Sequence, residues 1–211
     1  MKIGRTLAVA SLSGLLLAAI PVAAHANDVS HTGSYTVRAG QTIDGDLTVR
    51  NGSVKIYGNV EGDVRQIGKG SVTVYRSGEV DGSITESGSG GVRVYGEVDG
   101  NVTESGKGSV RVYRSGSVDG NIAERSSGDV RVDRGGEVDG NITERHAGKV
   151  VIRGEIDGNV TESGSGHLYV NSTAEVDGNV TERNAGNLYR YRKADIDGDV
   201  RESGKGRLVR R

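Results

Sequence analysis

The chain has 211 residues, with 35 glycines, one proline, no cysteine, tryptophan or phenylalanine, and aromatic residues at only 4%. The formal net charge of −1 lacks the positive excess that nucleic-acid binding requires, and the absence of cysteine excludes disulfides, thiol chemistry and cysteine-ligated metals. The large side chains that normally fill a compact core are nearly missing, so a conventional globular fold is disfavoured.

Residues 1–26 have the composition of a secretory signal peptide. Lys2 and Arg5 precede the apolar run LAVASLSGLLLAAIPVAA, and small residues at Ala24 and Ala26 flank a cleavage position. A retained N-terminal anchor is the alternative, but it would need a longer apolar run, and no second hydrophobic stretch follows. We therefore expect a cleaved signal peptide and a mature protein, without a transmembrane segment, in the periplasm, at the cell surface or outside the cell.

A short polar lead, residues 27–34, is expected before a repeat domain that spans residues 35–211. In this domain a pentapeptide of the type VDGNV recurs, and its central glycines are separated by 17 to 20 residues. A period near 20 residues indicates stacked repeats rather than a globular fold. The central glycines are Gly45, Gly62, Gly82, Gly100, Gly120, Gly140, Gly158, Gly178 and Gly198.

Each repeat contains short segments with strand-like alternation. In SVRVY, Val110 and Val112 share one face, and in VDGNI, Val118 and Ile122 share a face while Asp119 points outward. A third strand is expected around the following Thr-Glu pair, before a glycine-rich corner. The pattern predicts an all-β, single-stranded parallel β-solenoid (β-helix) of about nine coils of 18–20 residues, stacked ~4.8 Å apart. An antiparallel repeat sandwich or meander is the alternative.

Stacked coils turn each repeat position into a column of equivalent side chains. The aspartate before each central glycine suits the outward side of a bend, and the alternative is a stripe that attracts divalent cations. The next column, of asparagines, permits amide-to-amide hydrogen bonds along the stack. A third column, of glutamates two residues after an inward aliphatic residue, is expected to be an exposed, solvated face. The columns are Asp44, Glu61, Asp81, Asp99, Asp119, Asp139, Asp157, Asp177 and Asp197; Asn101, Asn121, Asn141, Asn159 and Asn179; and Glu86, Glu104, Glu124, Glu144, Glu162, Glu182 and Glu202.

The strongest candidate for a binding site is an outward strip of tyrosines with arginines beside it. Such a strip either stabilises the stack through ring contacts or binds a polysaccharide or another protein surface. Its residues are Tyr57, Tyr75, Tyr95, Tyr113, Arg93, Arg111 and Arg131. The histidines lack metal-ligand spacing, and columns that repeat in every coil offer no single catalytic pocket, so we expect no catalytic residue, metal or cofactor.

The motif G-x-V-x-G-[DN]-[IV], present once per coil, resembles the bactofilins. It stands here as GEVDGNV (Gly96 to Val102), GSVDGNI (Gly116 to Ile122), GEVDGNI (Gly136 to Ile142) and GEIDGNV (Gly154 to Val160). The resemblance covers residues 35–209, and it implies a right-handed, three-faced parallel β-helix that joins end to end into filaments without a nucleotide. Bactofilins are cytoplasmic, often membrane-associated proteins, whereas this chain begins with an export signal.

A solenoid has open ends whose unpaired strand edges recruit neighbours. The chain ends in RLVRR, where Leu208 and Val209 resemble the start of another coil; Arg210 and Arg211 either discourage stacking or meet an acidic partner. We therefore expect an exported structural or scaffolding protein that self-associates through its ends and is not an enzyme. The alternative is a periplasmic or cell-surface adhesin or glycan-binding module that uses the tyrosine and arginine strip.

Overall fold

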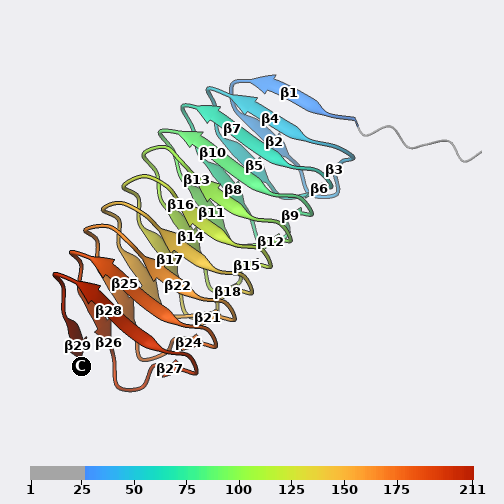
Figure 1. Cartoon of the computed structure of the whole chain (residues 1–211). Helices are drawn as coiled ribbons and strands as arrows, with labels where there is room; N and C mark the ends of the chain where they lie inside the picture. Colours follow the sequence, from blue (N-terminus) through green and yellow to red (C-terminus); the bar gives the residue numbers. More distant parts are fainter. Residues whose placement is uncertain (1–26) are drawn as a thin grey trace, which may run out of the picture.

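The computed structural model describes residues 27–211, which form a rod-shaped β-solenoid that runs from β1 at one end to β29 at the other (Figure 1). Each coil contributes one strand to each of three sheets, and every neighbouring pair of strands is parallel. The parallel pairing confirms the predicted solenoid and excludes the antiparallel alternative. The predicted signal peptide lies outside the described residues.

Sheet A has ten strands, and its neighbours in space are three strands apart in sequence. It contains the Thr-Glu segments, as the pattern predicted. Its strands are β1 (Val29–Thr32), β4 (Leu47–Arg50), β7 (Val64–Gly68), β10 (Ile84–Gly88), β13 (Val102–Glu104), β16 (Ile122–Glu124), β19 (Ile142–Glu144), β22 (Val160–Glu162), β25 (Val180–Asn184) and β28 (Val200–Gly204).

Sheet B also has ten strands and contains the Val-x-Val segments with the tyrosine and arginine columns. Its strands are β2 (Tyr35–Val37), β5 (Val54–Ile56), β8 (Val72–Val74), β11 (Val92–Val94), β14 (Val110–Val112), β17 (Val130–Val132), β20 (Val150–Ile152), β23 (Leu168–Val170), β26 (Leu188–Arg190) and β29 (Leu208–Arg210).

Sheet C has nine strands, each of two residues, that lead into the VDGN corners. Its strands are β3 (Thr42–Ile43), β6 (Asn59–Val60), β9 (Glu79–Val80), β12 (Glu97–Val98), β15 (Ser117–Val118), β18 (Glu137–Val138), β21 (Glu155–Ile156), β24 (Glu175–Val176) and β27 (Asp195–Ile196).

The core is a set of aliphatic columns that fill the space between the three sheets. Val110, Val112, Val118 and Ile122, one coil's inward residues, all have 0% exposure. Val110 lies in register with Val92 below it and Val130 above it, so like packs on like. Short β-branched side chains fill this narrow interior without the aromatic residues that a thicker core would need.

The central glycine of the pentapeptide is required because the corners stack directly on one another. A Cβ atom on Gly120 would lie 2.5 Å from the carbonyl oxygen of Gly100 in the preceding coil. In the glycine-rich loop after each Thr-Glu segment, a Cβ atom on Gly128 would overlap the carbonyl oxygen of Gly108. These contacts are backbone contacts, so neither site accommodates a side chain without moving a coil.

The solenoid begins earlier than the sequence suggested. Residues 29–32, expected within the polar lead, form β1, which pairs with β4 through Val29 and Leu47. At the other end Leu208 and Val209 do begin a further strand, β29, which pairs with β26. Within residues 27–211 no helix is long and apolar enough to cross a membrane.

Candidate functional site

The predicted tyrosine strip is a continuous stack of rings on the outer face of sheet B. The ring centroids are 4.0 Å apart for Tyr57 and Tyr75, 6.2 Å for Tyr75 and Tyr95, and 3.8 Å for Tyr95 and Tyr113, with near-parallel planes. Burial, followed by a hydrogen bond to Tyr113, raises the pKa of Tyr95 to about 12, so its phenol stays neutral. The structure therefore brings these four predicted residues together on one surface.

The arginine column beside these rings is partly occupied by an acidic partner. Arg93, Arg111 and Arg131 lie in register on adjacent strands, and Asp133 takes the position that tyrosine holds in earlier coils. Asp133 pairs with Arg111 at 2.6 Å and with Arg131 at 2.8 Å. Burial alone would raise the pKa of Asp133, but the hydrogen bonds from Arg131 and Arg111 lower it. The basic part of the predicted strip is thus largely an internal ion-pair cluster.

The aspartate ladder lies on the outer side of the corners between sheets C and A. It runs beside a second, mostly acidic column that was not predicted, two residues earlier in the coil, where Thr42, Asn59 and Ser117 are the uncharged members. The acidic members of this second column are Glu79, Glu97, Glu137, Glu155, Glu175 and Asp195. Burial and then neighbouring carboxylates raise the pKa values of Glu97, Asp99 and Asp139.

We call these two exposed columns together the acidic face. Within residues 27–211 no group of three or more histidine, aspartate or glutamate side chains is arranged to hold a metal ion. The divalent-cation alternative for the aspartate ladder therefore gains no support from the geometry. What the acidic face does offer is a long negative surface, since neither column contains lysine or arginine.

The asparagine column forms the predicted hydrogen-bonded ladder. The side-chain oxygen of Asn121 accepts hydrogen bonds from the backbone nitrogen of Asn141 at 2.8 Å and from its amide nitrogen at 2.9 Å. The same pair of bonds joins Asn101 to Asn121, Asn141 to Asn159 and Asn159 to Asn179. The ladder therefore ties consecutive coils together at the corner.

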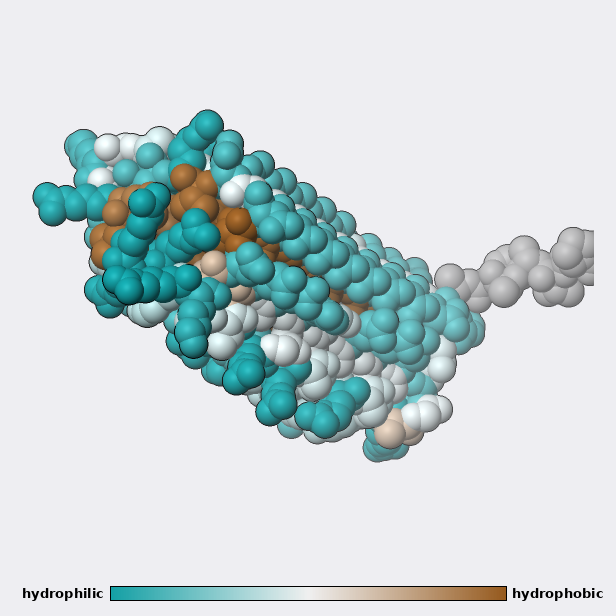
Figure 2. All heavy atoms as spheres, turned by 90° about the horizontal axis from the view of Figure 1, so that it is seen from below, coloured by the Kyte–Doolittle hydropathy of each residue, from teal (hydrophilic) through white to brown (hydrophobic). Residues whose placement is uncertain are grey.

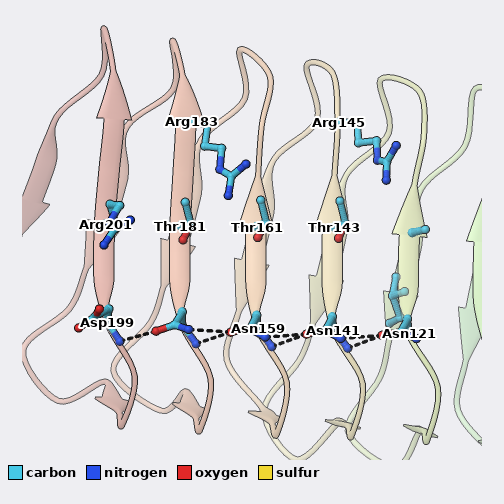
Figure 3. Close-up of a pocket in the computed structure, with 13 residues that line it drawn as sticks. Asn121, Asn141, Thr143, Arg145, Asn159, Thr161, Thr181, Arg183, Asp199 and Arg201 are labelled. Carbon is cyan, nitrogen blue, oxygen red and sulfur yellow. Dashed lines mark hydrogen bonds between the residues drawn. The ribbon is translucent and has the colours of Figure 1, made fainter.

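This ladder borders a groove of about 620 Å³ on the outer face of sheet A (Figure 3). Thr143, Thr161 and Thr181 lie along the groove, while Arg145 and Arg183 stand on the side opposite the asparagines (Figure 3). We call it the sheet A groove. Arginines, threonines and asparagines dominate its lining, which includes a single carboxylate, Asp199.

The glutamate column was expected to be an exposed, solvated face, and this prediction was wrong. Glu86, Glu104, Glu124, Glu144, Glu162 and Glu182 have 0% exposure and point into the solenoid. In each of them one carboxylate oxygen accepts one or two hydrogen bonds from backbone N–H groups of the loop that follows. For Glu104 the donors are Gly106 at 2.9 Å and Gly108 at 3.0 Å. The glutamate therefore closes the loop of its own coil from the inside.

Burial has a clear electrostatic consequence for these side chains. The second carboxyl oxygen of Glu86, Glu124, Glu144, Glu162 and Glu182 is buried without a hydrogen-bond partner. Desolvation, followed by the neighbouring carboxyl group of Glu104, raises the pKa of Glu86 and of Glu124 to about 7. Burial also raises the pKa values of Glu144, Glu162 and Glu182. Part of the column is therefore protonated near neutral pH, because adjacent buried carboxylates cannot all be charged.

The two ends of the rod are the places where the apolar core reaches solvent. The aliphatic and aromatic residues that pack on the core but remain half-buried are all in terminal coils: Val29, Tyr35, Ile196, Val200 and Leu208. Figure 2 shows hydrophobic residues gathered at the end of the rod opposite the grey segment. The strands there, β27, β28 and β29, each have a paired neighbour on one side only.

One family model matches the chain, and it does so twice. The family is described as bactofilin, polymer-forming cytoskeletal, and the matches cover residues 35–126 and 105–201. Neither the comparison with curated proteins nor the comparison with solved structures gives a significant match. The two matches overlap and together cover most of the solenoid, which agrees with a fold made of one repeated unit.

The buried glutamates make the stability of the rod depend on pH. Their pKa values are higher in the folded chain than in the unfolded chain, so protons bind the folded state more tightly, and stability decreases as pH rises from about 4.5 to about 7. We expect the free energy of unfolding to fall by on the order of 1 to 3 kcal/mol for each strongly shifted glutamate, measured by urea denaturation at pH 5 and pH 8.

The variant Glu124→Gln provides the matched control, because Gln66 already occupies this column in an earlier coil. Glutamine keeps the carbonyl acceptor but cannot ionise, so the variant should lose part of the pH dependence and be the more stable protein at pH 8. Equal slopes of stability against pH in the two proteins would contradict the interpretation.

Proposed function

The chain belongs to the bactofilin family of polymer-forming cytoskeletal proteins, and we propose that it polymerises through the open ends of its solenoid as an exported structural protein. The observation that carries the proposal is the location of the incompletely buried core residues. They lie in the terminal coils, where a second copy would cover them. The middle of the rod, by contrast, buries its inward aliphatic residues completely.

End-to-end contact would also complete the backbone pairing. At the C-terminal end, β27, β28 and β29 present one edge of each sheet, and at the N-terminal end, β1, β2 and β3 present the opposite edges. Unpaired N–H and C=O groups along such edges favour addition of further strands. No helix covers either end within residues 27–211. A second rod placed end to end therefore extends three sheets at once.

The export part of the proposal rests on residues 1–26. The charged start, the apolar run and the small residues before Asn27 have the order of a signal peptide. The described solenoid then begins directly after this segment, with β1 at Val29. Cleavage after Ala26 would leave residues 27–211, which contain all the strands described above.

A second function, surface binding through the tyrosine strip, is favoured by one observation. Four rings stack on the outside of sheet B, and the guanidinium of Arg111 lies 4.3 Å from the ring centroid of Tyr113. A flat aromatic surface of this kind can bind the apolar faces of sugars. We keep this adhesin or glycan-binding role as the alternative to a purely structural one.

The first test concerns the ends. The double variant Ile196→Lys/Leu208→Lys places charges on two half-buried core residues, and it should weaken end-to-end association by about a hundredfold or more, because each buried aliphatic side chain is worth ~2 kcal/mol. Light scattering and electron microscopy of the purified protein measure the length of the polymers. Val209→Lys, on the outer face of the same strand as Leu208, is the matched control and should polymerise normally. A wild-type protein that stays monomeric at high concentration would refute the proposal.

The second test concerns the tyrosine strip. We expect Tyr75→Ser/Tyr95→Ser/Tyr113→Ser to keep its polymer length, because these side chains lie outside the core. If the strip binds glycans, the triple variant loses retention on a glycan array while assembly is intact. Retention equal to that of the wild type would remove the adhesin alternative.

The third test concerns export. Expression of the full chain in a Gram-negative host, followed by osmotic shock, should release a protein whose N-terminal residue is Asn27, as read by mass spectrometry. A variant with Leu15→Arg/Leu16→Arg, which interrupts the apolar run, should stay in the cytoplasm. Recovery of uncleaved wild-type protein from the cytoplasm would show that the segment is not a signal peptide.

A further inference from the structure

The sheet A groove is a surface rich in hydrogen-bond donors and positive charge. Arg145, Arg183 and Arg201 line it and are exposed, and the ion pairs found among residues 27–211 all involve Asp133 on another sheet. Arg145 and Arg183 rise from the same column two coils apart (Figure 3). Guanidinium groups that lack a carboxylate partner are suited to bind one from outside the chain.

The corner beside this groove is neutral from Asn121 to Asn179 and carries one carboxylate, Asp199, at its C-terminal end. The same column also holds aspartate at Asp46 and Asp63, and the carboxylate of Asp63 accepts the same kind of backbone hydrogen bond, from Ser83 at 2.8 Å. Aspartate therefore satisfies the fold at this position. Compared with aspartate, asparagine removes a negative charge from the border of the groove. Its side-chain NH2 group has two N–H bonds, and the ladder uses one of them.

The same molecule carries a matching negative surface on another side. The acidic face, with its two columns of exposed carboxylates, lies on sheet C and the adjoining corners. Its aspartate column repeats once per coil, and the arginines of the groove lie one or two coils apart. The spacings on both surfaces are therefore multiples of the same coil repeat, ~4.8 Å. An acidic face laid along the groove can place a carboxylate opposite each arginine in more than one register.

We propose that the sheet A groove binds the acidic face of a second copy of this chain, so that rods associate side by side as well as end to end. The inference rests on the proposed structural function and adds a second, electrostatic contact to it. The groove and the acidic face belong to different sides of one rod, so each rod binds one neighbour and is bound by another. Such a heterologous contact continues from rod to rod, as a closed ring or an open bundle, depending on the angle between the two faces.

Charge reversal with rescue tests the proposal. The groove variant R125E/R145E/R183E, which reverses three exposed charges of one column away from the ends of the rod, and the acidic-face variant E137K/E155K/E175K each place like charges on both sides of the contact. Each alone should form about tenfold fewer side-by-side pairs than the wild type, counted as filament width in electron micrographs at 50 mM salt, with filament length unchanged. Mixing the two variants restores opposite charges and should restore the width.

The matched control is K55E/R93E/K149E, which makes the same change in net charge on sheet B and its corner. It should pair like the wild type. Loss of pairing in this control, or no loss in the groove variant, overturns the proposal, and so does failure of the mixture to pair. Filament length and filament width report the two contacts separately. Wide but short filaments would refute end-to-end assembly and leave the lateral contact standing. Long filaments of single-rod width would refute the lateral contact and leave end-to-end assembly standing.

The same protein variants also test whether the sheet A groove binds an acidic polymer instead of a second rod. Sodium alginate, a linear acidic polysaccharide, is added to fluorescently labelled wild-type and groove-variant rods, and binding is measured by anisotropy. The lateral contact predicts that alginate at most competes with pairing of the wild type. If alginate binding depends on the three arginines while filament width does not, the groove belongs to an anionic polymer and the proposal is wrong.

Discussion

The structure depends on one constraint: equivalent residues of consecutive coils lie directly above one another at the spacing of a β-ladder. Register pairs such as Val92 with Val110 and Glu104 with Glu124 repeat this relation along the rod. Each side chain within the rod therefore lies between the side chains at the equivalent positions of the preceding and the following coil. Residues that gain from such a neighbour, such as valine, asparagine and tyrosine, are favoured in columns. Glycine is required wherever backbones approach too closely for a Cβ atom.

The same constraint explains why charge is separated among the faces. Like charges in one column repel, so a column of carboxylates is tolerated either in water, as on the acidic face, or inside the rod in partly protonated form. Of these two arrangements, the buried column of glutamates constrains the backbone more than the exposed column does. A buried glutamate whose oxygen accepts hydrogen bonds from backbone N–H groups of the glycine-rich loop fixes the shape of that loop in six consecutive coils. The cost of burying a polar group is offset only because these backbone donors have no other partner.

Much of this architecture follows from the amino-acid sequence, since the inner positions of two segments per coil are marked by alternation around Val110 and Val118. The asparagine ladder and the tyrosine stack follow from the same alignment of repeats. The interior position of Glu104 could also have been found, because in Val102-Thr103-Glu104 the alternation places the glutamate on the side of the valine. Its charge argued for the opposite face, and the loop N–H groups that stabilise it inside are a property of the folded backbone. The sheet A groove likewise depends on side-chain directions that a repeat alignment does not contain.

The glutamate column is not uniform from end to end. Its first members are His31, Val49 and Gln66, none of which is a carboxylate; it continues through six buried glutamates and ends at Glu202 in a terminal coil, where a carboxyl oxygen lacks a partner. Deprotonation of the carboxyl groups therefore adds repulsion in the middle and the C-terminal part of the rod, while the first coils have no carboxylate in this column. Mild alkali would unwind such a rod from one direction, so that its N-terminal coils persist as a template on which the remaining turns can rewind.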